Sequence, residues 1–467
     1  MEGSENHPVH RVHHAGFLVI LGLIHLALGY SFSVFSPTYN ILGQALFSDI
    51  QSMKFYLATA MHCFGVILGT LLGTTLHNRP DSLLKLFSTD SLTIAGLIIL
   101  AVENPNAFLL GRGVFGLGRG LNLAFITKYT QNKSQTYINR IARLLTDGLG
   151  MAAGLLLGAW PPASQSLLWL YHSLIPAIPI FIKVLALVLC RNEVGKITKK
   201  NSEEDELPSQ NSSPKSGEPS EKNEVKKVSF DSVVSDVRQI SQINRICLMI
   251  FMAQVTGCAF FLVFATDIFS QDLTPTSSKP QEYSLFFSIA VLISLFFILP
   301  FQKKYKANRL VLLGLFGQGL IMAILVPLSL LENYEFLLKL ATVLYTSVHI
   351  ATISPAIKTY QALAEPKISN ILAAFSFAGA ALSILIGAVI ADSINYRITL
   401  ALFGAGSWLL CIIFSLLWKE EVPKGPAQPS TKAIESIMKK PKPLVTPIKT
   451  KFEVIPVEAK DSPRSEE

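Results

Sequence analysis

The sequence predicts an all-α, polytopic membrane protein with twelve transmembrane helices in two six-helix halves. Half of the 467 residues are hydrophobic and only 15% are charged, whereas soluble domains carry about 25% charged residues. The apolar residues gather in separate blocks, each about as long as the 20-residue helix that spans a bilayer core. A long polar segment divides these blocks into six and six.

Each apolar block is expected to form one membrane helix. Gly and Pro recur inside the blocks, and membrane helices tolerate both residues. The first block is too long for the apolar region of a signal peptide. The cysteines fall within or at the ends of blocks, so no extracellular disulfide framework is expected. The blocks are 17–37, 55–76, 83–102, 108–127, 141–159, 166–190, 246–268, 283–301, 309–331, 338–360, 369–391 and 398–418.

The polar segments complete the predicted organisation. Residues 200–227 are rich in Ser, Glu, Lys, Asn and Pro, which favours disorder. Residues 230–238 regain apolar spacing and are expected to form a short amphipathic helix on the inner face. The predicted parts are a cytoplasmic tail (1–16), the N-terminal half (17–190), a partly disordered cytoplasmic linker (191–245), the C-terminal half (246–418) and a disordered cytoplasmic tail (419–467).

The basic residues predict the orientation in the membrane. They concentrate in the even-numbered loops, as with Arg79 and Arg309, while the opposite loops hold little beyond Lys54, Lys279 and Arg397. This positive-inside bias places both termini in the cytoplasm, in the plasma membrane or an internal membrane. The net charge of +8 is therefore explained by the basic cytoplasmic loops, and no nucleic-acid partner is expected. The expected partners are the lipid bilayer and a small solute, with no metal or cofactor, and the protein partners of the tail are left open.

Several short motifs occur in a fixed order along the blocks. They are Gly65, Gly69 and Gly73 followed by Arg79, then Gly111-Arg112, Gln254-Val255-Thr256-Gly257 and Glu421-Val422-Pro423. Together these motifs resemble the sugar porter branch of the major facilitator superfamily, the branch that includes facilitative glucose transporters. The resemblance covers roughly residues 16–425, and it implies alternating access with the solute bound between the halves. Its motif residues are expected to serve packing and gating; they are Gly65, Gly69, Gly73, Arg79, Arg112, Glu193, Arg309 and Glu421.

Departures from the sugar porter pattern narrow the expected activity. Ala253 stands where a second glutamine is usual, and Ala259 where an asparagine is usual. A hexose site must pair many hydroxyls, so glucose itself is not expected. In proton-coupled relatives the counterpart of Arg112 pairs with a first-helix aspartate, and that position is Ser31 here. The resemblance therefore favours a uniporter, although the carboxyl of Asp147 remains an alternative proton carrier.

Polar and aromatic side chains inside the blocks are the candidate solute contacts. They are Gln254, Thr256 and Phe261 in the seventh block, Tyr345 and His349 in the tenth, and Arg119 and Asn122 in the fourth. Packing and helix–helix hydrogen bonding are the competing interpretation of these residues.

Arg119 and Asp147 are predicted to form a buried ion pair, because a helical rise of 1.5 Å per residue puts them at similar depths in neighbouring helices. Three functions follow from these patterns, and none is an enzyme. The first is a uniporter for a sugar or polyol-like solute. The second is an organic anion carrier that uses Arg119. The third is a non-transporting sensor or scaffold derived from a transporter.

The charge asymmetry yields a first testable prediction. A Lys215→Cys variant places a thiol in the linker, and a membrane-impermeant thiol reagent applied to intact cells should not label it. Labelling should appear after the membrane is permeabilised. Labelling from outside intact cells would reverse the predicted topology.

Overall fold

The computed structural model describes residues 22–27, 29–30, 33, 46–47, 53–76, 82–129, 136–158, 168–189, 230–271, 280–331 and 335–417. These residues are helical apart from short turns, and no strand occurs among them. The all-α prediction is therefore confirmed. The predicted tails, residues 191–229 of the linker, Arg79, Glu193 and Glu421 lie outside the described residues.

The described helices of the N-terminal half match the second to sixth predicted blocks. Residues 22–27, 29–30 and 33, within the first predicted block, are also helical. Polar residues interrupt the fifth block, yet its helix is continuous. The helices are α3 (Met53–Thr75), α4 (Ser82–Leu100), α5 (Pro105–Tyr129), α6 (Thr136–Gly158) and α7 (Leu168–Leu189).

The C-terminal half begins earlier than its apolar sequence. Helix α9 starts at Phe230, so the predicted amphipathic segment and the start of the seventh block form one continuous helix. The following helices match the remaining blocks. They are α9 (Phe230–Val255), α10 (Cys258–Gln271), α11 (Pro280–Lys304), α12 (Ala307–Leu331), α13 (Glu335–Val348), the π-helical turn η3 (His349–Ile353), α14 (Ser354–Leu363), α15 (Pro366–Ser393) and α16 (Tyr396–Leu417).

The helices carry the apolar surface of a multi-pass integral membrane protein. Within the described residues, seven helices are long and apolar enough to cross a bilayer, judged by length and composition. Large apolar side chains also lie on their outer faces, as with Phe296 at 80% exposed and Leu416 at 70%. Contact of such side chains with lipid tails costs no free energy, whereas their exposure to water is unfavourable.

Glycines bring α3 and α5 into backbone contact. A Cβ atom added at Gly65 would lie 2.2 Å from the carbonyl oxygen of Gly113, and one at Gly69 would lie 2.3 Å from that of Leu117. A Cβ at Gly73 would meet the Cβ of Ala124 at 2.3 Å. Because these neighbours are backbone atoms or a short side chain, they cannot move aside. Small residues of this kind permit close approach of membrane helices.

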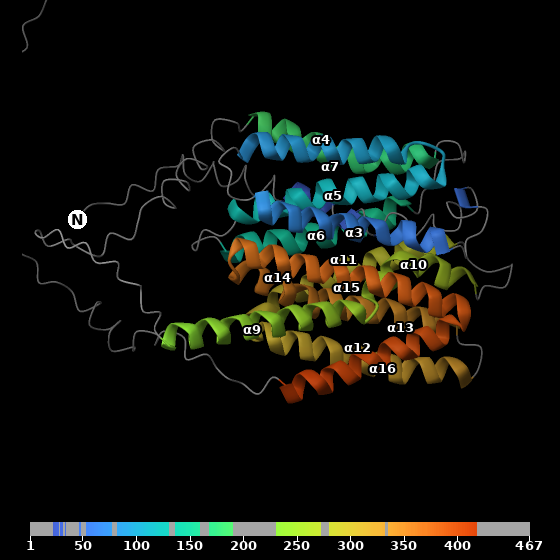
Figure 1. The fold of residues 1–467 in the computed structure, drawn as a ribbon. Coiled ribbons are helices and arrows are strands. Elements are labelled where there is room, and N and C mark those ends of the chain that lie inside the picture. Colours follow the sequence, from blue (N-terminus) through green and yellow to red (C-terminus); the bar gives the residue numbers. More distant parts are fainter. Residues whose placement is uncertain are drawn as a thin grey trace, which may run out of the picture. The chain divides into compact units, whose positions relative to one another are not determined.

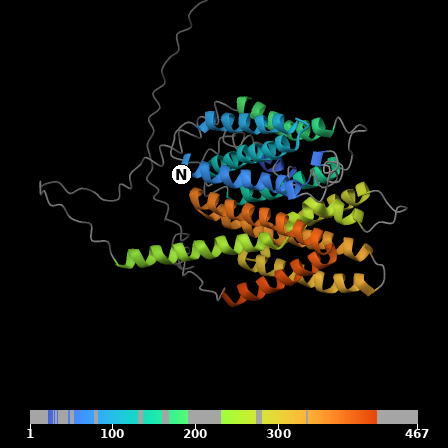
Figure 2. The same ribbon diagram turned by 45° about the vertical axis from the view of Figure 1, so that its right-hand side comes forward.

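Several pairs of described helices pack across the two halves, among them α14 with α6 and α15 with α5. Helix α3 packs against α15, and α6 packs against α11. The hydroxyl of Ser288 on α11 donates to the carbonyl oxygen of Ala152 on α6 at 2.9 Å. Figure 1 shows α15 beside α3, and the same neighbours persist in the rotated view of Figure 2.

Two helices of the C-terminal half are interrupted near this interface. Between α9 and α10 the chain turns at Gly257, whose φ of 103° is strained for any residue with a Cβ. In the tenth block, the N–H of Ser354 bonds to the carbonyl of His349, five residues back, which gives the π-helical turn η3. Pro355 follows directly and has no N–H to donate. Non-helical backbone at membrane depth is tolerated where it is buried in protein or lines a cavity.

The glycine contact between α3 and α5 predicts a stability effect. Gly69→Ala should lower the unfolding free energy by about 1–3 kcal/mol, because the added methyl overlaps the backbone of α5. The matched control is Gly406→Ala, where an added Cβ meets nothing within 4 Å. That control should hold or raise stability by up to about 1 kcal/mol. Thermal unfolding of both variants in detergent measures the difference, and equal midpoints would contradict the close contact.

Candidate functional site

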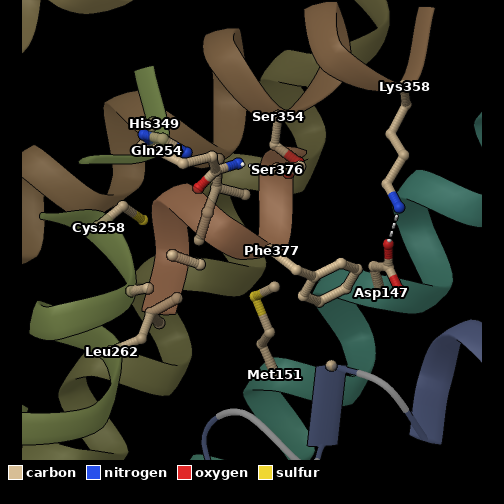
Figure 3. Close-up of a pocket in the computed structure, with 14 residues that line it drawn as sticks. Asp147, Met151, Gln254, Cys258, Leu262, His349, Ser354, Lys358, Ser376 and Phe377 are labelled. Atoms are coloured by element: carbon tan, nitrogen blue, oxygen red, sulfur yellow. Dashed lines mark hydrogen bonds and ion pairs between the residues drawn. The ribbon is translucent and has the colours of Figure 1, made fainter. Parts of the chain in front are cut away.

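A cavity lies between the two halves and is lined by both. Its volume is about 110 Å³, and a single water needs roughly 10–15 Å³ of such space. Figure 3 shows its wall, which the N-terminal half lines with Gly29, Asp147 and Met151. The C-terminal half lines it with Gln254, Cys258, Ala259, Leu262, His349, Ile350, Ser354, Lys358, Ser376, Phe377 and Ala380. The cavity therefore has room for a small organic molecule held by both halves.

An ion pair crosses the cavity from one half to the other. The ammonium of Lys358 on α14 lies 2.9 Å from Oδ2 of Asp147 on α6 (Figure 3). The side chains are 17% and 13% exposed, so both reach the open space. The other carboxylate oxygen of Asp147 lies 3.0 Å from Nδ1 of His25, whose side chain is fully buried. Asp147 thus has one partner in each half of the protein.

Neutral polar groups stand in another part of the wall. Nε2 of Gln254 on α9 donates to the hydroxyl of Ser376 on α15 at 3.2 Å. His349 begins the π-helical turn, and its Nδ1 lies 3.4 Å from Nε2 of the buried Gln318 on α12. Gln254 and His349 were predicted as solute contacts, and both line the cavity. The structure thus places two of the predicted contacts in the wall of the cavity, and their role in solute binding stays a prediction.

The remaining wall is apolar. In Figure 3, Phe377 and Met151 stand between the Lys358–Asp147 pair and the group of Gln254 and His349. Leu262, Ile350 and Ala380 add further apolar surface. Ligand sites with a mainly apolar wall and a few polar groups favour solutes with an apolar body, because burying that body is favourable while the polar groups set its orientation.

Three other predicted contacts lie in the protein interior, outside the cavity wall. Tyr345 is fully buried, and its hydroxyl donates to the carbonyl oxygen of Thr256 and lies 2.9 Å from the Ser407 hydroxyl. The Thr256 hydroxyl bonds to the carbonyl of Ala253 in its own chain segment. Phe261 packs edge-on against the Tyr345 ring at 5.0 Å. Tyr345 therefore supports the break between α9 and α10 by pairing a backbone carbonyl at the break.

The predicted ion pair between Arg119 and Asp147 is not formed. Among the described residues, Asp147 pairs with His25 and Lys358, while a guanidinium nitrogen of Arg119 donates to the carbonyl oxygen of Ile24 at 3.0 Å. The guanidinium also lies 5.7 Å from the Phe115 ring centroid. The depth argument placed the two residues at similar heights, but it contained no information on which way each helix faces. Arg119 does not line the cavity.

Asn122 belongs to a buried polar cluster inside the N-terminal half. Lys183 on α7 donates to Oδ1 of Asp90 on α4 and, at 2.8 Å, to Oδ1 of Asn122 on α5. Asn122 donates to Asp90 at 3.0 Å and accepts from the Thr89 hydroxyl at 2.8 Å. All four side chains are at most 3% exposed. The cluster ties three helices together, and none of its members lines the cavity.

The other predicted motif residues that the structure describes also lie away from the cavity. Arg112 is buried, and it donates to the carbonyl oxygen of Thr59 on α3 at 3.4 Å. Arg309 is exposed in the first turn of α12.

The ionisable residues His25, Asp90, Lys183 and Lys358, which form the ion pairs described above, were not singled out in the sequence analysis. All four fall inside predicted membrane blocks. An ionisable residue inside a membrane segment is by default a functional hypothesis, with a partner to be found. That signal was available for each of them. The sequence could not have shown that Lys358 pairs with Asp147 and Lys183 with Asp90.

The buried cluster predicts how the N-terminal half responds to loss of charge. Lys183→Met should lower the unfolding free energy by about 3–5 kcal/mol, because it leaves the Asp90 carboxylate buried without its cation. The double variant Asp90→Asn with Lys183→Met should recover most of that loss. Thermal unfolding in detergent tests this, and a double variant no more stable than Lys183→Met would contradict the pairing.

Comparisons with known proteins agree with the helical architecture. The xylose transporter XylE from E. coli, in a partially occluded inward-open conformation, superposes with a TM-score of 0.64 at 13% identity, over 86% of this chain and 98% of that one. The nucleoside transporter NupG gives 0.57 at 15% identity, over 86% and 99%. The POT family transporter PepTSo gives 0.58 at 13% identity, over 86% and 96%. At these identities the likeness shows the fold alone.

Sequence comparison provides the family. No curated protein matches the chain. The sequence pattern of the Major Facilitator Superfamily matches residues 21–370, about three quarters of the chain. With the two helical halves and the cavity between them, this match shows that the chain is a member of the Major Facilitator Superfamily of membrane transporters.

Proposed function

We propose that the protein carries a small organic solute across the membrane by alternating access, with the solute bound in the cavity between the halves. The observation that supports this proposal is a cavity walled by both halves and crossed by a single ion pair among its lining residues. Membership of the family makes the protein a transporter and not an enzyme. A solute held at such a midplane site is carried when the halves rock around it.

The helix breaks supply the places where the cavity wall can bend. Gln254 and Cys258 flank the turn at Gly257, and His349, Ile350 and Ser354 lie in or beside the π-helical turn. Breaks of this kind line solute sites in many transporters, and π-helical turns occur frequently at functional sites. Lys358 and Asp147 belong to different halves, so opening of the cavity on their side of the membrane requires them to separate.

The solute proposed from the sequence is sugar-like or polyol-like and moves by uniport. The neutral donors and acceptors of Gln254, Ser376, Ser354 and His349 support this proposal, and XylE is a xylose transporter by its description. The apolar remainder of the wall favours a solute with few hydroxyls. Anion carriage through Arg119 loses its support, because Arg119 bonds to a backbone carbonyl outside the cavity.

The orientation proposed from the loop charges places the linker and both termini in the cytoplasm. With that orientation, the tenth block runs toward the cytoplasm, and Lys358 lies near its end. The ion pair between Lys358 and Asp147 then stands on the cytoplasmic side of the cavity. The plasma membrane and an internal membrane remain alternative locations for the protein.

A cavity-filling variant tests the proposal. Ala380→Trp places an indole in the cavity from α15 and should abolish uptake of a transported solute into proteoliposomes. The control is Leu409→Trp on α16, a position that is 58% exposed on the lipid-facing surface. That variant should transport as the unmodified protein does. Expression and thermal unfolding are measured for both, so that misfolding is distinguished from loss of the site.

The same assay separates transport from a scaffold role and uniport from proton coupling. No uptake of any solute in a broad panel by well-folded protein would reject the proposed function. If uptake collapses with a protonophore while the membrane voltage is clamped, uniport is wrong and Asp147 becomes the first residue to test. Unchanged uptake under those conditions supports uniport.

A further inference from the structure

We infer that the cavity binds the carboxylate of a small organic acid at Lys358, and that this carboxylate takes the place of Asp147. The inference rests on the proposed carriage of a small organic solute in this cavity, and it names a carboxylate in place of the sugar-like solute expected from the sequence. Among the described residues that line the cavity, Lys358 is the only one with a permanently basic side chain, either lysine or arginine. Its side chain is 17% exposed and faces the open space. A carboxylate is the natural partner for such an ammonium inside a low-dielectric site.

With His25 protonated, the Asp147 carboxylate has two cationic partners, so a solute anion can take one of them without leaving a charge unpaired. When a solute carboxylate binds Lys358, Asp147 keeps its second contact, the 3.0 Å approach to His25. Lys358 in turn keeps an anionic partner. An unpaired charge at this depth would be costly, so the exchange requires a protonated His25, whose imidazolium then balances the Asp147 carboxylate while Lys358 balances the solute.

A cationic solute lacks that advantage. An amine would have to bind Asp147 and displace Lys358, whose only ion pair among the described residues is with Asp147. The lysine would then be left in the cavity wall without an anion. The geometry therefore favours anions over cations, although the wall carries one charged group of each sign.

The apolar lining of the cavity determines which organic group, attached to the carboxylate, fits the site. Phe377 and Met151 lie beside the ion pair in Figure 3, and Leu262 and Ile350 extend the apolar surface. Beyond them, Gln254 and Ser376 offer neutral hydrogen-bonding groups. The fitting solute is a monocarboxylate whose apolar body lies against Phe377 and Met151.

Matched acids and amides test the inference on the purified full-length protein. Acetate, butyrate and benzoate are compared with acetamide, butyramide and benzamide, which have nearly the same shape without the charge. Benzylamine serves as the cationic probe, and sodium chloride matches ionic strength. A ligand that binds the folded state raises the thermal midpoint. Benzoate or butyrate should raise it, while the amides and benzylamine should do so much less.

Substitutions of Lys358 test whether the acid binds at this residue. Lys358→Gln should weaken the apparent affinity for the acid about tenfold or more, because a charge-assisted hydrogen bond is lost. Lys358→Arg keeps the positive charge and should retain binding. That result would show that the loss in Lys358→Gln does not come from a general packing defect. Lys367→Gln removes an exposed lysine at the start of α15, away from the cavity, and should bind as the unmodified protein does. If Lys358→Gln does not fold, the double variant Lys358→Gln with Asp147→Asn replaces it.

The outcomes separate this inference from the proposed function. Equal stabilisation by acids and amides, or unchanged acid binding in Lys358→Gln, would overturn the carboxylate site. If a neutral solute is bound and transported, and Ala380→Trp abolishes both, while no acid binds, the cavity function stands and the inference fails. If acids bind equally well to Ala380→Trp, the cavity is not their site and the inference fails, while the proposed function is still decided by the uptake of the other solutes.

Discussion

The hydrocarbon core of a bilayer contains no water to hydrogen-bond with the backbone, so every N–H and C=O must find its partner within the protein. This constraint explains the continuous helices, and it makes each interruption informative. At the Gly257 turn, the Tyr345 hydroxyl pairs the carbonyl of Thr256. At the π-helical turn, the N–H of Ser354 reaches the carbonyl of His349. Both interruptions adjoin the cavity, where the wall can depart from regular helix because polar partners are available.

Charged side chains inside the bilayer must also find partners within the protein. Two ion pairs provide such partners in different surroundings. Lys183 and Asp90 lie within one half, are almost fully buried and are surrounded by Asn122 and Thr89. Lys358 and Asp147 lie in opposite halves and remain partly open to the cavity. The first pair can stay intact when the halves move, so it stabilises one half as a unit. The second spans both halves, so under the proposed mechanism it would separate as the halves move apart on that side.

Much of the architecture was predictable because hydropathy and length are local properties. The seventh block of 246–268 corresponds to the end of α9 and to α10, and the tenth block of 338–360 to α13, η3 and α14. The start of α9 at Phe230 was not predicted as one helix, because apolar and polar segments can share a continuous backbone helix. The predicted solute contacts divide between the cavity wall and the interior. Gln254 and His349 line the cavity, while Tyr345, Thr256 and Phe261 serve the interior around the helix break.

The sequence by itself determined the fold class, the membrane segments and the presence of ionisable residues within them, because each depends on residues close together in the chain. The tertiary structure alone decided which charges meet. Asp147 and Arg119 have similar depths, yet Asp147 pairs with Lys358, 211 positions away, and with His25. Helix rotation and the packing of one half against the other set those distances. Neither can be read from spacing along a single helix, since both depend on contacts distributed over the whole bundle.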